Sequence, residues 1–399
     1  MERKLKDKIC IIGIGWTAFG EHFDKSYEDL VADAGWAAIN DAGITRDQID
    51  AAWIGTAFPD AGVYKGRSGM DLAEPLGLFD VPVVRVSNYC TTGAEAIRAA
   101  VNSLLAGESS VALALGVEKL RDRSPQESIV KMMVEMGHPL YQKGFTAAGT
   151  FAAYASRQFV RYGVTREDLA RVSVKNHENA TLNPKAHFRK AVSGEQVLRS
   201  PMVADPLTVM DSCPTTDGAA AVILVRAEDV EKFSGVPVYL KGMGMAVSSG
   251  WDLPYFDDSF DLTSFRATRV AAEKAYREAG ITNPRQQLDL AEVHDCFSIV
   301  ELLTYEDLGL CEEGEAKELI RSGVTRRDGE IPVNVSGGLL SCGHPVGATG
   351  VRMVCEIVEH LRGTAGERQV PGARTGLTHN IGGPGAVASV IILGKEKDT

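Results

Sequence analysis

Two cysteines and two histidines stand at positions in the sequence where acyl-transfer chemistry would need them. Cys90 lies in S-N-Y-C-T-T-G, His344 lies in C-G-H-P-V-G-A-T-G, and His294 and Cys296 stand two residues apart in H-D-C-F. At all three places an apolar run ends and a helical pattern begins. A nucleophilic thiol, a second thiol that moves protons and a pair of oxyanion-stabilising imidazoles suit reversible carbon–carbon bond making between thioesters.

Cys90 is the predicted nucleophile. Strand-like V-V-R-V-S-N leads to it, and a helical pattern over 94–105 follows. A thiolate at a helix N-terminus is stabilised by unpaired N–H groups and by the helix dipole, so we expect a lowered pKa for this cysteine. Taken by itself, the segment also fits a buried structural cysteine.

His344 is predicted to face an oxyanion. Pro345 suits the first turn of the helix that follows. A helix N-terminus disfavours the imidazolium, so a neutral ring would donate one hydrogen bond to the developing charge. The glycines Gly343, Gly347 and Gly350 indicate that something approaches the backbone closely. A surface histidine at a helix start is the alternative interpretation.

His294 and Cys296 end the apolar strand L-D-L-A-E-V. Alternation along an extended chain points both side chains to one side and Asp295 to the other. Ser298 and Glu301 are predicted to form a capping box for the next helix. Metal ligation and plain packing are the alternatives. We expect no bound metal, because nothing nearby supplies third and fourth ligands at a standard spacing.

Two polar turns are candidate parts of the same site. In N-I-G-G-P-G, the glycines Gly382 and Gly383 allow backbone N–H groups to point at a negative oxygen. In D-S-C-P-T-T-D-G, the residues Thr215 and Thr216 would line a tunnel for a substrate. We therefore place Gly383, Asn380 and the two threonines at the binding site for the substrate. Simple turns would also account for both segments.

Composition limits the possible functions. The chain has 399 residues, 44% of them apolar and 24% charged, with a net charge of −11. This balance gives no support to nonspecific binding of nucleic acid or of an anionic membrane. Seven cysteines without a C-x-x-C pair argue against a zinc ribbon within the chain and fit a reducing compartment. No apolar run has the length of a signal peptide or membrane span, so we expect a cytoplasmic protein.

An internal repeat indicates a duplicated fold. Residues 37–58 and 274–297 both read as an amphipathic helix, an A-G-I-T stop, a polar link, an apolar strand and a corner ending in Phe. Further on, C-T-T-G-A at 90–94 aligns with H-P-V-G-A at 344–348. Each is followed by a helical pattern and then by an apolar strand. Alternating strands and helices predict layered α/β halves.

The repeat sets the predicted domains. The halves span residues 1–125 and 236–399, and an inserted loop domain with a return strand occupies 126–235. This insertion is well placed to cover the active site. We expect the insertion and residues 245–265 to shape the acyl pocket, with the methionines at 132, 133 and 136 packing in a lid or core.

Together these motifs resemble the thiolase superfamily over essentially the whole chain. The resemblance implies two βαβαβαββ halves in a five-layered α-β-α-β-α arrangement with an inserted loop domain. Ordinary thiolases carry Asn-Glu-Ala-Phe at the second catalytic corner and a proton-shuttling cysteine in the last glycine-rich turn. This chain has H-D-C-F at the corner and Asn380 in place of that cysteine. Both departures resemble the sterol-carrier-protein type of thiolase.

The resemblance also implies a role for each residue. Cys90 would be acylated, and Cys296 would move protons as the acid/base. His294 and His344 would form the oxyanion hole for the enolate of the leaving thioester. The backbone N–H groups of Cys90 and Gly382 would form a second oxyanion hole over the acyl-enzyme carbonyl.

The implied reaction is CoA-dependent cleavage of a 3-oxoacyl-CoA, with CoA as cosubstrate and no bound cofactor. Members of this type include the thiolase subunit that cleaves benzoylsuccinyl-CoA, so an aromatic or branched acyl group is a candidate. The family implies a homodimer, and some members act with a separate zinc-ribbon and OB-fold protein. The alternatives are a biosynthetic acetoacetyl-CoA thiolase, a non-catalytic scaffold that binds CoA esters, and a condensing synthase. The second thiol of H-D-C-F argues against the last of these.

Overall fold

The computed structural model describes residues 5–60, 65–129, 146–248 and 261–398. Its main sheet has the strand order β3-β2-β4-β7-β1-β8-β11-β10-β9. The strands are β1 (Ile9–Trp16), β2 (Ala51–Gly55), β3 (Val83–Val86), β4 (Val111–Glu118), β7 (Gly218–Arg226), β8 (Val238–Val247), β9 (Leu290–Val293), β10 (Thr375–Gly382) and β11 (Val387–Gly394).

This sheet consists of two halves with the same topology. In the first half β7 runs antiparallel to β1 and β4, and in the second half β11 runs antiparallel to β8 and β10. The halves meet where β1 pairs with β8 through Cys10–Tyr239 and Ile11–Val238. The counterpart of β3 in the second half is reduced to a parallel bridge between Val333 and Ala291. The predicted duplication is therefore confirmed.

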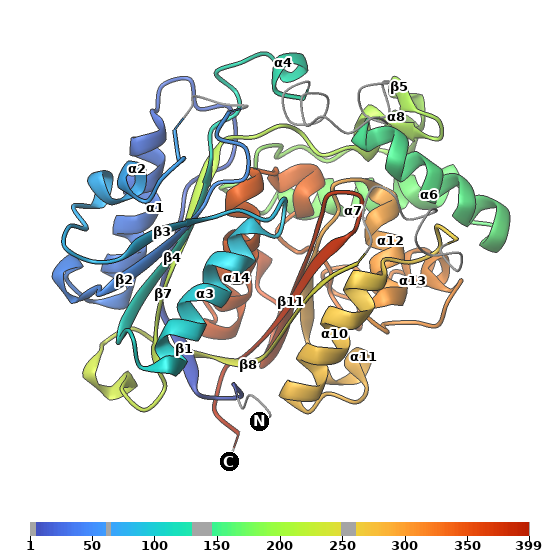
Figure 1. Cartoon of the computed structure of the whole chain (residues 1–399). Coiled ribbons are helices and arrows are strands. Elements are labelled where there is room, and N and C mark those ends of the chain that lie inside the picture. Colours follow the sequence, from blue (N-terminus) through green and yellow to red (C-terminus); the bar gives the residue numbers. More distant parts are fainter. Residues whose placement is uncertain (1–4, 61–64, 130–145, 249–260, 399) are drawn as a thin grey trace.

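Helices complete five layers (Figure 1). In Figure 1 α3 (Thr92–Ala106) and α14 (Val346–Arg362) lie between the two groups of strands. On the outer faces lie α1 (Tyr27–Ala42) with α2 (Met70–Ala73) in the first half, and α10 (Arg266–Ala279) with α11 (Pro284–Gln287) in the second. The predicted apolar positions of the two central helices are all buried: Ala94, Ile97, Val101, Leu104, Val351, Val354, Val358 and Leu361.

The predicted helix boundaries follow from local chemistry. Ser26 caps α1 by accepting the backbone N–H of Asp29, in a capping box. Gly43 and Gly280 end α1 and α10 in the left-handed conformation, with φ of 65° and 78°. Glycine adopts this conformation without a side-chain clash, which explains the repeated A-G-I-T stop.

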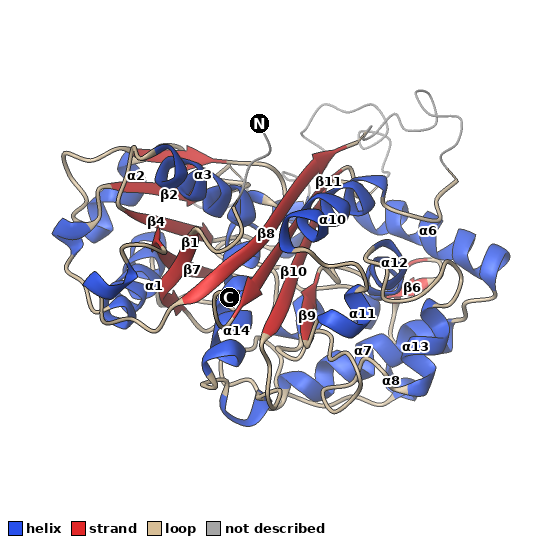
Figure 2. Ribbon diagram, turned by 90° about the horizontal axis from the view of Figure 1, so that it is seen from below, coloured by secondary structure: helices blue, strands red, loops and turns tan. Residues whose placement is uncertain are grey.

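The inserted region lies against the second half. It contains α4 (Pro125–Ile129), α6 (Ala147–Tyr162), α7 (Arg166–Ala180), α8 (Gly194–Arg199), β5 (Met202–Ala204) and β6 (Leu207–Thr208). Figure 2 shows α7 and α8 gathered beside β9 with α12 (Ser298–Asp307) and α13 (Ala316–Ser322). Met132, Met133, Met136 and residues 249–260 of the predicted pocket-shaping segment lie outside the described residues. Among the described residues, no helix is long and apolar enough to cross a bilayer.

Candidate active site

A sharp turn between β3 and α3 carries Cys90 into the interior. Cys90 stands two residues before Thr92, the first residue of α3. The preceding residue, Tyr89, has a φ of 47°, which is unusual for a bulky side chain. Gly382 of β10 packs against this turn, and a Cβ on it would lie 2.9 Å from the Cβ of Tyr89. Glycine at position 382 therefore lets β10 of the second half approach the Cys90 turn of the first half.

The sulfur of Cys90 opens into a cavity of about 310 Å³. Six of the predicted site residues line it, namely Cys90, Thr215, His294, Cys296, His344 and Gly383. The remaining lining is mostly apolar and comprises Phe58, Tyr89, Leu120, Thr146, Ala147, Ala148, Phe151, Val203, Ser212, Cys213, Pro214, Phe297 and Val346. The residues predicted at three distant places in the sequence thus share one cavity.

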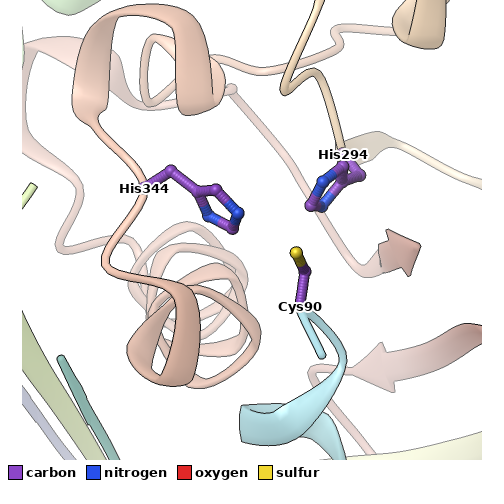
Figure 3. A group of neighbouring side chains, drawn as sticks. All are labelled: Cys90, His294 and His344. Atoms are coloured by element: carbon purple, nitrogen blue, oxygen red, sulfur yellow. The ribbon is translucent and has the colours of Figure 1, made fainter. Parts of the chain in front are cut away.

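The two histidines converge on the nucleophile (Figure 3). The Cys90 sulfur and one ring nitrogen from each of His294 and His344 all lie within 4.8 Å of one another. The two rings are nearly perpendicular, at 88°, with 5.2 Å between their centroids. A thiol and two imidazoles at this spacing form a possible ligand set for a metal ion as well as a catalytic cluster. The expectation that no metal binds stays a prediction.

Hydrogen bonds assign the tautomer of His344. Its Nδ1 lies 2.7 Å from Oγ1 of Thr349. The hydroxyl of Thr349 donates its own proton to the carbonyl of Pro345, at 3.0 Å, so Oγ1 accepts from the ring. His344 then carries its proton on Nδ1 and presents an unprotonated Nε2. Because burial lowers its pKa to about 3, the ring is neutral and Nε2 is a base.

The opposite tautomer is assigned to His294. The side-chain amide of Asn380 points its Nδ2 at Nδ1 of His294, at 3.5 Å, and donates to Sδ of Met353 at 3.2 Å. A donor facing Nδ1 leaves the ring proton on Nε2. Burial, with His344 nearby, lowers the pKa of His294 well below its usual value. One histidine is therefore set as a donor and the other as an acceptor.

The pKa of Cys90 differs from the sequence-based expectation. Burial raises it to about 12, although a hydrogen bond from the backbone N–H of Gly383 lowers it. The buried carboxyl of Glu118 raises it further. The cost of desolvating a thiolate thus outweighs the helix terminus, and Cys90 needs a base to become nucleophilic.

Cys296 has a neighbouring thiol that sequence reasoning missed. Cys213 lines the same cavity, and its backbone N–H donates to the carbonyl of Cys296 at 2.9 Å. Burial raises the pKa of both thiols, and their proximity to each other and to Cys90 raises the pKa of Cys296 further. Cys213 lies in D-S-C-P-T-T, the turn that was singled out for its threonines.

Three of the predicted site residues, two assigned to binding and one to an oxyanion hole, do not line the cavity. Thr216 accepts the backbone N–H of His344 at 3.2 Å and contacts Nδ1 of His187 at 3.1 Å. Asn380 lies behind His294, and Gly382 lies against the Cys90 turn. Their geometry suits holding catalytic groups in place. Among the residues that sequence reasoning missed, Thr349 stood within the motif G-A-T-G.

The predicted capping box at Ser298 and Glu301 is wrong. The N-cap residue of α12 is Phe297, and its side chain makes no capping hydrogen bond. Ser298 instead donates from Oγ to Asp211 at 2.7 Å, and Glu301 accepts from Asn176 at 2.7 Å. Buried tertiary partners compete with the local helix N–H groups for both side chains. The predicted helix itself is present.

Comparison with known proteins gives a consistent result. A family model described as "Thiolase, N-terminal domain" matches residues 9–228, and "Thiolase C-terminal domain-like" matches 249–395. The chain is 42% identical to an acetyl-CoA acetyltransferase of Methanothermobacter thermautotrophicus, covering 97% of this chain and 99% of that protein. It is 34% identical to the benzoylsuccinyl-CoA thiolase subunit BbsB of Thauera aromatica, covering 95% and 96%. Human sterol carrier protein 2 is 35% identical, covering 95% and 71%.

Solved structures with the same fold include partnered and unpartnered proteins. The Ltp2-ChsH2(DUF35) aldolase matches with a TM-score of 0.83 and 26% identity over 100% of both chains. A monomeric SCP2-thiolase like protein type 1 from Mycobacterium smegmatis matches with a TM-score of 0.74 and 20% identity, covering 100% of this chain and 79% of the other.

Proposed function

The chain belongs to the thiolase family, and we propose that it cleaves a 3-oxoacyl-CoA with CoA through an acyl-Cys90 intermediate. The observation that carries this proposal is the cluster of the Cys90 sulfur and one ring nitrogen each of His294 and His344 within 4.8 Å, in a largely apolar cavity. A non-catalytic scaffold would have no need of such a cluster.

In the first half-reaction Nε2 of His344 takes the proton of Cys90, and the sulfur attacks the 3-oxo carbon. The backbone N–H groups of Cys90 and Gly383 hold the resulting oxyanion, because Gly383 lines the cavity and its N–H faces the Cys90 sulfur. The C2–C3 bond then breaks, and its electron pair forms the enolate of the leaving thioester. The enolate oxygen accepts hydrogen bonds from Nε2–H of His294 and from the now protonated His344, and Cys296 protonates C2.

In the second half-reaction the thiolate of Cys296 takes the proton of CoA. The CoA thiolate attacks the acyl carbonyl, and the bond to the Cys90 sulfur breaks. The leaving sulfur recovers its proton from His344, so the enzyme returns to its starting state. The opposite tautomers of the two histidines support this division of roles, because one begins as a base and the other as a donor.

The acyl group that we propose is bulky and apolar, with an aromatic acyl group as the leading candidate. The rings of Phe151 and Phe297 form one wall of the cavity, with centroids 5.1 Å apart and planes inclined at 33°. Ala147 and Ala148 leave space beside them at the start of α6. The relative that acts on benzoylsuccinyl-CoA supports this class. The biosynthetic acetoacetyl-CoA reaction is the alternative, since another relative is an acetyl-CoA acetyltransferase.

We also propose a homodimer formed along β3. This strand is the outer edge of the first half, and the side chain of Val84 on it is 46% exposed. An unpaired strand edge offers backbone N–H and C=O groups to a second strand. A separate zinc-ribbon and OB-fold partner is a further proposal, supported by the partnered structure that resembles this chain.

The test is a CoA-dependent cleavage assay. The purified protein is incubated with acetoacetyl-CoA, a medium-chain 3-oxoacyl-CoA, benzoylacetyl-CoA and benzoylsuccinyl-CoA, and the thioester products are measured by mass spectrometry. We expect cleavage that requires CoA and is fastest for the aromatic substrates. Faster cleavage of acetoacetyl-CoA would select the biosynthetic alternative. Cleavage of the carbon–carbon bond without CoA and without an acyl-enzyme would instead indicate a retro-aldol reaction.

A further inference from the structure

Asp295 stands between the catalytic residues His294 and Cys296 but faces away from the cavity. Its side chain is fully buried against the turn Gly338–Cys342, which leads to His344. Oδ1 accepts the backbone N–H of Leu339 at 2.6 Å, and Oδ2 accepts that of Leu340 at 3.3 Å. This carboxyl group therefore connects the H-D-C-F corner to the chain segment that carries the second histidine.

Gly338 makes the close approach possible. A Cβ on this residue would lie 2.2 Å from Oδ2 of Asp295 and 2.7 Å from its Cγ. The residue also has a φ of 61°, which favours glycine. The space between Gly338 and the carboxyl group of Asp295 is thus too small for a side chain at position 338.

A second contact fixes the carboxyl group from the inserted region. Nδ2 of Asn176, on α7, donates to Oδ2 of Asp295 and to Oε2 of Glu301, each at 2.7 Å. Nζ of Lys175 forms an ion pair with Oε1 of Glu301 at 2.9 Å and donates to Oδ1 of Asn176 at 2.6 Å. All four side chains are buried. A buried carboxylate that accepts several N–H groups is held in one orientation.

We infer that Asp295 is a positioning residue that holds the His294–Cys296 corner and the His344 segment at their working separation. The inference rests on the proposed function. Stabilisation of the enolate requires both imidazoles at the same oxygen. Exchange of CoA through the acyl-enzyme uses Cys296 and His344 for proton transfer but needs no hydrogen bond from His294, so it depends on fewer of the groups that Asp295 positions. Loosening Asp295 therefore affects carbon–carbon cleavage more than thioester exchange, because an error of an ångström in such a site is costly.

The test compares these two reactions in Asp295→Asn, which keeps the size of the side chain but places an amide donor where one oxygen accepts hydrogen bonds from Leu340 and Asn176. We expect kcat for cleavage to fall about 30- to 100-fold with KM changed by less than about 3-fold. Exchange of isotope-labelled CoA into the acyl-CoA product should fall by less than about 5-fold. Because a buried donor without an acceptor can impair folding, Asn176→Ser provides a milder variant with the same order of effects.

Asp168→Asn is the matched control. Like Asp295, Asp168 has a buried carboxyl group, but it lies on α7 and pairs with Arg321 at 2.7 Å instead of contacting the H-D-C-F corner. Its kcat for cleavage should stay within about 2-fold of the wild type, whatever it costs in thermal stability. Equal losses of cleavage and exchange in Asp295→Asn and Asn176→Ser, or losses no larger than in the control, would overturn the inference. Absence of CoA-dependent cleavage in the wild-type protein would instead overturn the proposed function.

Discussion

The two halves of the molecule place different chemistry on the same structural element. α3 and α14 occupy equivalent places in the central layer, but the first is preceded by the thiol of Cys90 and the second by the imidazole of His344. Likewise the strand β2 ends near Phe58, whereas its counterpart β9 leads into His294 and Cys296. Neither half contains all the residues that we propose for catalysis. Because the fold is duplicated, the two halves place residues at equivalent positions, and because the two copies have diverged, those positions carry different chemical groups.

The outer edges of the two halves also differ. In the first half β3 is an edge strand with an exposed Val84. In the second half the bridge at Val333 extends beyond β9, and Nζ of Lys175 on α7 donates to the carbonyl of Val333 at 2.7 Å. Within the described residues the first edge pairs with no further strand, and it is the edge at which we propose that another copy binds, while the inserted region covers the second.

Among the residues that differ between the halves, we expect the largest loss of turnover on substitution of Cys296. Cys296→Ala should lower kcat by about 10³-fold, because the protonation of C2 and the deprotonation of CoA both pass through this sulfur. Cys213→Ala is the matched control in the same cavity and should stay within about 3-fold. Steady-state turnover of a 3-oxoacyl-CoA measures both. A larger loss in Cys213→Ala would move the acid/base role to that thiol.

His344 should act as a base that is neutral across the physiological range. Because burial lowers its pKa to about 3, kcat/KM for the 3-oxoacyl-CoA should stay level from pH 8 to pH 6. His344→Asn should lower kcat/KM by about 10²-fold or more. His22→Asn, a change of a half-buried histidine at the first-half surface, should have little effect. A decline of the wild-type rate with a midpoint near 6.5 would contradict a neutral resting histidine.

A charged residue on the edge strand β3 tests the proposed difference between the outer edges of the two halves. Val84→Lys should weaken self-association by about 10-fold or more, since lysine on an edge strand opposes pairing with another strand. Sedimentation velocity over a concentration series measures this change. Val160→Lys, at a position 82% exposed on α6, serves as the control and should leave the oligomer unchanged. A wild-type protein that stays monomeric would refute the dimer.

The smallest effect concerns stability and pH. His379 of β10 is buried with a pKa lowered to about 3, so the unfolded chain binds a proton at a higher pH than the folded one. Above pH 6.5 this histidine does not lower the free energy of unfolding. As the pH falls from 6.5 to 5, it lowers the free energy of unfolding by about 2 kcal/mol. Urea unfolding measures the free energy of unfolding of the wild type and of His379→Gln at both pH values. The two proteins should differ less at the lower pH. An equal loss of stability in both proteins between the two pH values would contradict a buried neutral ring at His379.

The repeated pattern in the sequence predicted the duplicated halves, the two central helices and the three corners that meet in the cavity. It succeeded because helix starts, glycine stops and strand alternation are local properties. Alternation also predicted that Asp295 would point away from His294 and Cys296, as its contact with Leu339 confirms.

Other features depend on tertiary contacts and left no local signal. The raised pKa of Cys90 comes from burial by distant segments. The side chain of Glu301 finds Asn176 and Lys175 in the inserted region instead of the start of its own helix. The place of Cys213 beside Cys296 depends on a backbone contact between residues far apart in the sequence.

Intact-protein mass spectrometry of Cys90 tests the central claim most directly. The wild-type protein, mixed with a 3-oxoacyl-CoA in the absence of free CoA, should gain the mass of one acyl group and lose it when CoA is added. Cys90→Ala should gain no mass, while Cys10→Ala, which removes a cysteine buried in β1, should behave like the wild type. An acyl adduct that persists in Cys90→Ala, or a wild-type protein that turns over without one, would contradict the account.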